Sequence, residues 1–576
     1  MKTLFISIST ATFMLFCSLA FSADELRSAG ESVFATDQSC QWQSPSQQHA
    51  EFEMRYQIDN PTPLPKSAPG MTVANVKIKR LNIFNPNNPD EDNALFNFAN
   101  KINFVTEESV IENILLFQSG DPYDPKLILE SERLLRNQRY LYDAKINVEQ
   151  TCADQVDVTV VTRELWTLMP EIDFSRTGGQ NSSRLGFRDT NLFGWGKRLS
   201  MTYNSDEERS GYNFIYEDPN ILGSRYKARF EYGDNDDGAR HYLDFSLPFY
   251  SVTTPYSYGV LSYSNDRTEP VYRDGIVVSQ FQQHTQVNSA YFATSLQLEK
   301  WIRRVSIGIQ VEDHQFSEIA TTQLPIAADR KLAFPWVSGH WLEDNYIKVN
   351  NFDSIHRTED LNLGWDIRTR IGYSPEQLSN DDDRIIYEAS LNKAIFQDDN
   401  TLWRFNSGIR GYWNLEQSAL ENAVLSGSVQ LNLNTDLTES WYSLIRINLG
   451  ENLTADQQIS LGGETGLRGY PLNYQSGDRS VLFSVEKRYY WEYHLLQLFK
   501  VGGAAFYDIG HAWYQQPSSS GLIGNNDILH NIGVGLRLAP SRANARTVIH
   551  LDLAMPINPR EEIDSVQWLV TVKNSF

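Results

Sequence analysis

Apolar and polar residues alternate one by one through most of residues 168–576. The stretch YKARFEY at 226–232 is typical, because Lys227, Arg229 and Glu231 separate its aromatic and small residues. Successive side chains of a β-strand point to opposite faces, so this alternation predicts strands with one apolar and one charged face. Further runs of the same kind lie at 243–249, 530–538 and 549–553.

Residues 71–167 follow a different pattern and form a separate unit. Val76, Ile78, Leu81 and Ile83 predict a strand, and alternating valines at 156–160 predict another. Thr106 and Asp124 each precede a helical pattern and are suitable N-caps, and a proline follows Asp124 at the first helical position. With one further strand before the valines, the order β-α-α-β-β predicts a small α+β domain.

The N-terminus predicts export. Residues 1–22 are typical of a signal peptide, with an early lysine, an apolar run at 4–19 and small residues at Ala20 and Ser22. Residues 23–70 are rich in Gln, Ser and Pro, which predicts a flexible leader. No apolar run of about 18 residues follows the signal, so no transmembrane helix is expected in the mature chain.

Alternation alone favours a soluble β-sandwich, whose strands alternate in the same way. Three features favour a barrel: the alternating domain is long and undivided, aromatic residues recur near strand ends, and the chain ends on an alternating strand. A closed barrel also leaves no unpaired edge in lipid. The final strand carries Trp568, Val570, Val572 and Phe576.

The predicted fold class is therefore mainly β. It consists of a transmembrane antiparallel β-barrel at residues 168–576, preceded by the small α+β domain at 71–167. At about ten residues per strand, the barrel segment would supply roughly 14 to 18 strands.

Charge and motifs exclude several functions. A net charge of -22 argues against a nucleic-acid surface, which needs clustered Lys and Arg. The ten histidines are scattered, and no His-Glu-x-x-His, Cys-x-x-Cys or Gly-x-Ser-x-Gly motif occurs. We predict no catalytic, cofactor-binding or metal-binding residues and no enzymatic activity. Cys40 and Cys152 could form one disulfide in an oxidising compartment or remain free thiols, and both possibilities stay open.

A glycine-rich stretch, LGGETGLRGYPLNYQSGD at 461–478, lies between two alternating runs. Its five glycines predict a backbone that bends sharply or lies close to another part of the chain. Arg468 near its centre could be solvated, bind an anion or pair with a distant carboxylate. The candidate positions of this loop motif are Gly463, Leu467, Arg468, Gly469 and Tyr470.

Two carboxylates are candidates for pairing with Arg468. Phe506, Asp508 and Gly510 share one face of a predicted strand, and Glu486 lies on the inward face of the preceding one if the apolar faces meet lipid. The guanidinium could then bind both carboxylates through charge-assisted hydrogen bonds. Breaking such a buried contact would be costly. The alternative is three separate, solvated charges in the lumen.

These stretches together resemble the BamA/TamA superfamily of outer-membrane barrels, also called bacterial surface antigens. GGETGLRGY is similar to the Arg-Gly motif of its sixth extracellular loop, FYDIG to its Phe-x-Asp-x-Gly strand motif, and LGFRDTNLFGWGKRL to the segment near the barrel start. ILLFQSGDPYDPKLILESERLLRNQRYLYDAKINV resembles a POTRA module, and the terminal WLVTVKNSF resembles a signal strand ending in Phe. The resemblance covers residues 71–576.

The resemblance implies a 16-stranded barrel in the outer membrane of a Gram-negative bacterium, with the POTRA-like domain in the periplasm. The sixth loop would fold into the lumen, where Arg468 would pair with Asp508 and Glu486. A seam would run between the first and last strands, near 168–176 and 567–576. Members of the family insert barrels or export polypeptides. The expected partners are therefore outer-membrane lipid, unfolded polypeptide clients and a periplasm-spanning protein, but no nucleic acid.

Two other functions stay open. The protein could be a passive outer-membrane pore. It could also be a surface antigen or adhesin that uses long outer loops, such as one around Gln315 to Asn345. Only one POTRA-like module is visible, whereas better-known members of the family carry two to five.

Overall fold

A computed structural model describes residues 64–573, except for 153, 178, 356, 399, 437, 516–526, 544–546 and 558–562. The predicted signal peptide, most of the leader, Cys40 and Phe576 lie outside the described residues, as does the side chain of Cys152. Neither the leader prediction nor the state of the two cysteines is tested. No helix in the part of the chain that the structure describes is long and apolar enough to cross a membrane.

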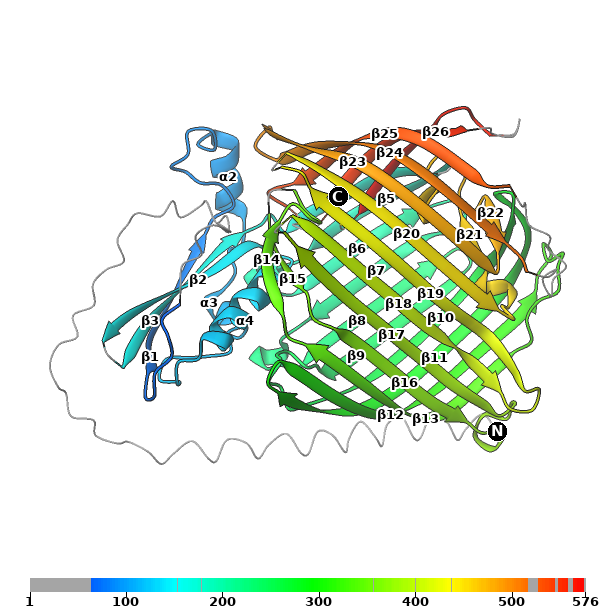
Figure 1. Cartoon of the computed structure of the whole chain (residues 1–576), viewed down its shortest axis with the longest axis horizontal. Coiled ribbons are helices and arrows are strands. Elements are labelled where there is room, and N and C mark those ends of the chain that lie inside the picture. Colours follow the sequence, from blue (N-terminus) through cyan, green and yellow to red (C-terminus); the bar gives the residue numbers. More distant parts are fainter. Residues whose placement is uncertain are drawn as a thin grey trace. The chain divides into compact units, whose positions relative to one another are not determined.

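The N-terminal module comprises six elements (Figure 1). They are β1 (Thr72–Leu81), α2 (Ala94–Ile102), α3 (Glu108–Glu112), α4 (Pro125–Arg136), β2 (Leu141–Cys152) and β3 (Gln155–Glu164). Strand β3 lies in the middle of the sheet, parallel to β1 and antiparallel to β2. Both features predicted for the start of the second helix are confirmed. The Asp124 side chain accepts a hydrogen bond from the Lys126 amide at 2.9 Å, and Pro125 is the first residue of α4. Apolar side chains of the sheet, α3 and α4 form one core.

Two sequence predictions for this module are wrong. The order β-α-α-β-β omits α2, which lies in an insertion at residues 82–104 between β1 and α3. Thr106 is not the N-cap of α3, because that helix starts at Glu108 and Glu107 occupies the cap position. The Thr106 hydroxyl instead donates to the buried Glu164 carboxylate at 3.0 Å, since this partner in β3 lies within reach.

The remaining described residues form a ring of antiparallel strands. The first ten are β4 (Leu168–Thr177), β5 (Gln180–Asp189), β6 (Arg198–Ser205), β7 (Ser210–Asp218), β8 (Lys227–Asn235), β9 (Gly238–Leu247), β10 (Tyr256–Arg273), β11 (Ile276–Leu298), β12 (Trp301–Glu318) and β13 (Arg330–Glu343). Five follow as β16 (Asp366–Ser374), β17 (Arg384–Gln397), β18 (Thr401–Asn414), β19 (Ala419–Asn434) and β20 (Glu439–Glu451). The last five are β23 (Arg479–Leu495), β24 (Phe499–Trp513), β25 (Leu529–Pro540), β26 (Val548–Ile557) and β27 (Gln567–Lys573).

The ring of described residues thus has twenty strands, and the expected 16 is wrong. The difference arises at the start of the barrel. Strands β4 to β9 have only eight to ten residues each and short connections, so residues 168–247 supply six strands. The segment around Gln315 to Asn345, considered as a long outer loop, consists mainly of β12 and β13, which leaves only 319–329 between them.

The barrel wall is apolar on its outside, which is the reverse of a soluble protein. Along β12, Val305, Ile307, Ile309 and Val311 are exposed, while the residues between them are less so. The same pattern holds on β25, where Ile532, Val534 and Leu536 are exposed and Asn531 and Arg537 are buried. Such an outer surface is stable only against lipid. The predicted fold class, a mainly β protein with a transmembrane barrel, is therefore confirmed.

The ring closes where the last strand meets the first. Val570 of β27 faces Arg176 of β4, and among the described residues this is the only register pair between these strands. The neighbouring strands β26 and β27 share seven. Trp568 and Val572 point outward from β27, Val570 is half-buried, and the Arg176 guanidinium lies 5.2 Å from the centre of the Trp568 ring.

We call the end of the barrel where β4 begins the module end and the opposite end the far end. Because the strand number is even, β27 also finishes at the module end. Two small hairpins lie apart from the wall. One is β14 (Tyr346–Asn350) with β15 (Thr358–Asn362), in the connection from β13 to β16 at the module end. The other is β21 (Ile459–Leu461) with β22 (Gln475–Gly477), from the far end. A short helix, α5 (Glu376–Ser379), follows β16.

Candidate functional site: a loop bound inside the barrel

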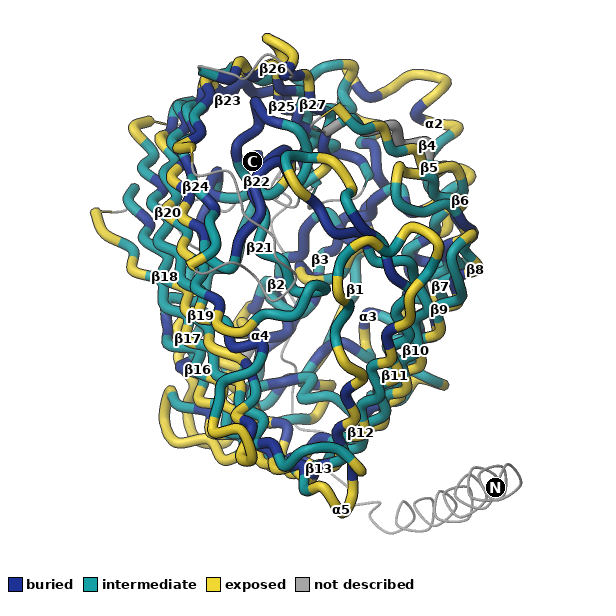
Figure 2. Tube along the Cα trace, turned by 90° about the vertical axis from the view of Figure 1, so that its right-hand side faces the viewer, coloured by how far each residue is buried: buried dark blue, intermediate teal, exposed yellow. Residues whose placement is uncertain are grey.

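The connection from β20 to β23, residues 452–478, is called the lumen loop here. Its hairpin β21–β22 lies inside the ring of strands (Figure 2). Two glycines account for its path. Gly463 has φ of 54°, a left-handed conformation that is unfavourable for most other residues. At Gly469 a Cβ atom would lie 2.6 Å from the Cβ of Asn531, so only glycine lets the loop approach β25 this closely.

Arg468 is buried at the tip of the lumen loop and bonds to two wall strands. Its Nε and Nη2 donate to the two oxygens of Asp508 at 2.9 and 2.7 Å. Its Nη1 donates to Glu486 Oε1 at 2.6 Å, and Nη2 also reaches Ser484 Oγ at 3.3 Å. The planar guanidinium suits such a fork of carboxylate bonds. The structure therefore brings together the loop arginine and the two carboxylates that the sequence placed on inward positions.

Strand register explains why these groups meet. Ser484 of β23 lies directly opposite Asp508 of β24, and Asp508 lies opposite Asn531 of β25. Both neighbours donate to the Asp508 carboxylate, Ser484 Oγ at 2.6 Å and Asn531 Nδ2 at 2.9 Å. The ring of Phe506 lies beneath the guanidinium of Arg468, 3.4 Å from ring centre to Cζ. A cation over an aromatic face adds attraction, and more so where both groups are buried as here.

Further ion pairs lie around Arg468. Arg488 donates to the second oxygen of Glu486 at 2.9 Å, and Arg537 pairs with Asp552. Three arginines and three carboxylates thus lie together, all of them buried: Arg468, Arg488, Arg537, Glu486, Asp508 and Asp552. Buried ions need compensation of this kind, and removing one member leaves another uncompensated. Sequence reasoning missed Arg488, Arg537 and Asp552, although all three lie on inward positions of their strands.

Apolar side chains pack the rest of the lumen loop against the wall. Leu467 and Tyr470 are fully buried, in a cluster with Leu461, Tyr474, Leu482, Ala512, Leu529 and Ile563. The Tyr470 hydroxyl donates to the carbonyl of His530 at 3.1 Å. Gly510, the inward residue after Asp508, lies next to Leu461. The loop is thus attached to β23, β24 and β25 by charge, packing and hydrogen bonds.

A second element occupies the module end, and the sequence did not reveal it. The hairpin β14–β15 bonds to α4 of the N-terminal module through Arg136, whose Nε and Nη2 donate to Asp360 at 2.8 and 2.7 Å. Glu132 of α4 pairs with Lys348. A guanidinium-carboxylate fork between elements more than 200 positions apart has no local sequence signature.

The same hairpin also bonds to inward-facing residues of the barrel wall. Arg404 of β18 donates to both oxygens of Asp353 at 2.7 and 2.6 Å. Asn432 of β19 donates to the carbonyl of Phe352 at 3.2 Å. Ile355 packs with Tyr490, Ala539 and Val548. The connection 344–365 therefore joins the N-terminal module to the barrel interior.

Two successive turns at the module end share a motif. Residues 189–194 (DTNLFG) and 218–223 (DPNILG) each have Asp, Asn two positions later, and a left-handed apolar residue before glycine, Phe193 or Leu222. In the first turn Asn191 is fully buried, donates to the Thr106 hydroxyl at 2.9 Å and accepts from the Gly196 amide at 2.6 Å. The first of these turns therefore bonds the module to the barrel.

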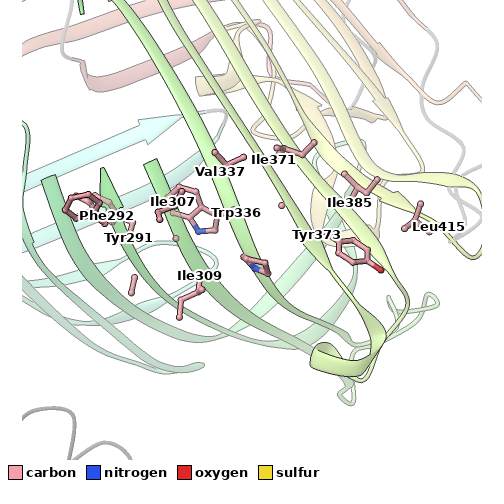
Figure 3. Close-up of a pocket in the computed structure, with 14 residues that line it drawn as sticks. Tyr291, Phe292, Ile307, Ile309, Trp336, Val337, Ile371, Tyr373, Ile385 and Leu415 are labelled. Carbon is pink, nitrogen blue, oxygen red and sulfur yellow. The ribbon is translucent and has the colours of Figure 1, made fainter. Parts of the chain in front are cut away.

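A shallow apolar groove of about 920 Å³ lies on the outside of the wall, away from the lumen loop (Figure 3). Exposed Phe292, Ile307, Ile309, Val337, Ile371 and Tyr373 line it. It contains no group suited to catalysis and fits a lipid-facing surface. Within the described residues, no cluster of His, Cys, Asp and Glu could hold a metal ion.

Comparison with known proteins gave two family matches. Residues 191–570 match the Omp85 superfamily domain, and residues 96–164 match the POTRA family described as a surface antigen variable number repeat. The second match covers much of the N-terminal module. No relative was found among the curated proteins.

Solved structures with a similar chain include BamA from Haemophilus ducreyi lacking POTRA domains 1–3, at 12% identity, with 87% of this chain and 84% of that chain covered and a TM-score of 0.35. CdiB from Escherichia coli has 10% identity, coverages of 87% and 76% and a TM-score of 0.46. CdiB from Acinetobacter baumannii has 10% identity, coverages of 90% and 93% and a TM-score of 0.40. The family assignment depends on the sequence match and not on these scores.

Barrels of this superfamily are outer-membrane proteins of Gram-negative bacteria, and their POTRA domains lie in the periplasm. They act in outer-membrane protein insertion or polypeptide translocation. The family model matches well over half of the 576 residues, and the lumen loop and the inward strand residues that bind it lie within the match. The chain belongs to the Omp85 superfamily.

Proposed function

We propose that this protein guides an unfolded polypeptide into or across the outer membrane. The N-terminal module would lie in the periplasm, so the module end of the barrel faces the periplasm and the far end faces the cell exterior. A client strand would add to an edge of the module sheet, whose outer strands are β1 and β2. Residues 120–123 already bond to the start of β1, and Glu132 and Arg136 bond to β2 at 144–146, so the client would pair with the rest of either edge. A periplasm-spanning partner could deliver the client.

The observation that carries this proposal is the lumen loop bound through Arg468. A channel for free diffusion gains nothing from a loop fastened across its interior by a buried ionic network. A translocation or insertion barrel benefits from such a loop, because the loop keeps the lumen closed until a client binds. In this proposal no covalent step occurs. The driving force is folding of the client and burial of its apolar surface in lipid.

Depletion of the protein, followed by quantitative proteomics of the outer membrane and the culture medium, tests the proposal. At least one barrel or exported protein should fall in amount, and wild-type protein supplied from a plasmid should restore it. Unchanged levels of every outer-membrane and secreted protein would rule the proposal out.

The alternative of a passive pore is distinguished by conductance in planar bilayers. Our proposal predicts a barrel that is mostly closed and that opens when residues 459–477 are deleted. A wide, steady current through the wild-type protein would favour the pore instead.

A further inference from the structure

The insertion at residues 82–104, which contains α2, is attached to the barrel at both sides of the seam. On one side, the ring of Phe104 packs edge-on against Phe193 with ring centres 5.5 Å apart, and Phe193 contacts Trp195 at 5.3 Å. Both barrel residues belong to the turn between β5 and β6. This fixes the C-terminal end of the insertion next to the first strands.

On the other side, the insertion contacts the turns that precede the last strand. Arg542, in the turn from β25 to β26, pairs with the buried Glu91 at 2.5 Å. Phe96 stacks on Phe84 at 4.1 Å, and Leu498 of the β23–β24 turn packs against the same cluster. Strands β4 and β27 lie between these two attachments in the ring. The insertion therefore crosses the periplasmic end of the seam.

Helix α2 presents apolar side chains that no other part of the described structure covers. Phe96 is the buried side chain of this helix. Leu95, Phe98 and Ile102 are 68%, 58% and 46% exposed, and Phe104 just beyond the helix is 53% exposed. At 3.6 residues per turn, positions 95, 98 and 102 lie on one side of the helix.

This apolar surface continues onto the barrel. Phe193 and Trp195 are about half exposed, and the wall above them exposes Leu185 and Phe187 of β5. The amine of Lys197 lies 5.7 Å from the Trp195 ring centre. An exposed tryptophan beside a lysine, at the end of a lipid-facing strand, is typical of a membrane interface. The stripe of α2 is thus joined through Phe104 to a surface that already meets lipid.

We propose that α2 lies in the periplasmic leaflet of the outer membrane, with Leu95, Phe98 and Ile102 inserted among the lipids at the foot of the seam. This inference depends on the outer-membrane placement proposed above, but not on transport of a client. The partner is the lipid surface itself. An amphipathic helix held there displaces lipid headgroups beside β4 and β27, where the wall is least paired.

The test uses the mature chain, residues 23–576, which lacks Cys17 of the predicted signal peptide, with Cys40→Ser and Cys152→Ser. One introduced cysteine carries the fluorophore NBD. The protein is reconstituted in vesicles of phosphatidylethanolamine and phosphatidylglycerol with brominated acyl chains. Phe98→Cys is the test position. Ile307→Cys on the lipid-facing wall is the positive control, and Lys126→Cys, exposed on α4, is the negative control. We expect blue-shifted, bromine-quenched emission at 98 and 307 and neither effect at 126.

Emission at position 98 that matches position 126 would overturn the inference and would leave a client or another protein as the occupant of α2. A second set of variants tests the other apolar side chains of the helix. Combined Phe98→Asn and Ile102→Asn should abolish quenching of NBD at Leu95→Cys, while quenching at 307 stays unchanged. Because the vesicles contain no client, these outcomes are separate from the depletion experiment.

Discussion

Replacement of Arg468 by alanine tests the lumen loop most directly. The change removes three bonds to carboxylates and one to Ser484. At about 1.5–3 kcal/mol for each bond to a charged group, the sum would exceed 4 kcal/mol. Glu486 keeps its bond to Arg488, and Asp508 keeps its bonds to Ser484 and Asn531, so part of the loss is compensated. We therefore expect a net cost of about 3–5 kcal/mol, the usual cost of breaking a buried ion pair.

Hydrogen exchange of reconstituted protein provides the assay. The amides of Gly463 and Tyr470 bond within the loop, to Tyr470 O at 3.1 Å and Leu467 O at 3.0 Å, and they exchange when the loop opens. A cost of 3–5 kcal/mol corresponds to roughly a hundred-fold to several-thousand-fold faster exchange. Amides of the wall strands should stay protected.

Two control variants make this result specific. Arg368→Ala removes an exposed arginine that pairs with Asp366 on β16, and it should leave the loop unchanged, since exposed pairs contribute about 0–1 kcal/mol. Arg468→Lys keeps the charge but not the fork and should fall between wild type and alanine. Wild-type protection of the loop amides in Arg468→Ala would refute the reasoning, because the loop would then be held by apolar packing alone.

Three further predictions concern other contacts. Gly469→Ala should destabilise the loop by about 1–3 kcal/mol, because the added Cβ would lie 2.6 Å from the Cβ of Asn531. Protease sensitivity of the loop at graded urea concentrations measures this change, and unchanged sensitivity would contradict it. Arg136→Ala should release the β14–β15 hairpin at a cost of about 3 kcal/mol, because it leaves the Asp360 carboxylate unpaired. Limited proteolysis should then cleave the chain within 344–365. If no new cleavage occurs, the contacts with the barrel wall are enough to hold the hairpin. Burial raises the pKa of Glu164 from 4.5 to about 8, so the contribution of this group to stability is full below pH 4.5 and is lost as the pH rises through about 8. The free energy of unfolding of the module should therefore fall over this pH range, and that of Glu164→Gln should fall less. Equal slopes of unfolding free energy against pH in both proteins would refute the assignment.

The parts of the fold that the sequence predicted are those decided by local pattern. Alternation identified the barrel strands because each residue's side chain must face either lipid or lumen. Asp124 and its following proline identified the start of α4 because a cap acts within one turn. Alternation along two strands also placed Glu486 and Asp508 on the lumen-facing side, which made them candidate partners of Arg468.

The missed features depend on partners distant in sequence or on turn geometry. Phe96 is the buried side chain of helix α2, so this helix lacks the broad buried face by which a helix is recognised in a sequence. The hairpin β14–β15 is fixed by Arg136, 224 positions from Asp360. The strand number was underestimated because the strands and turns of residues 168–247 are short. Asp552 and Arg537 joined the ionic network through strand register, which one sequence does not specify.

The count of twenty strands has a geometric consequence. A barrel's diameter grows with its strand number, so this wall encloses a wider space than the 16-stranded ring expected at first. Circumference can only increase by whole hairpins if both chain ends are to stay on the same side. The repeated turn at 189–194 and 218–223 joins consecutive hairpins of similar length in the part of the wall that adds strands. A wider barrel needs more chain to close its lumen. The lumen loop enters this lumen from the far end and the β14–β15 hairpin from the module end, so the two segments together close one enlarged opening.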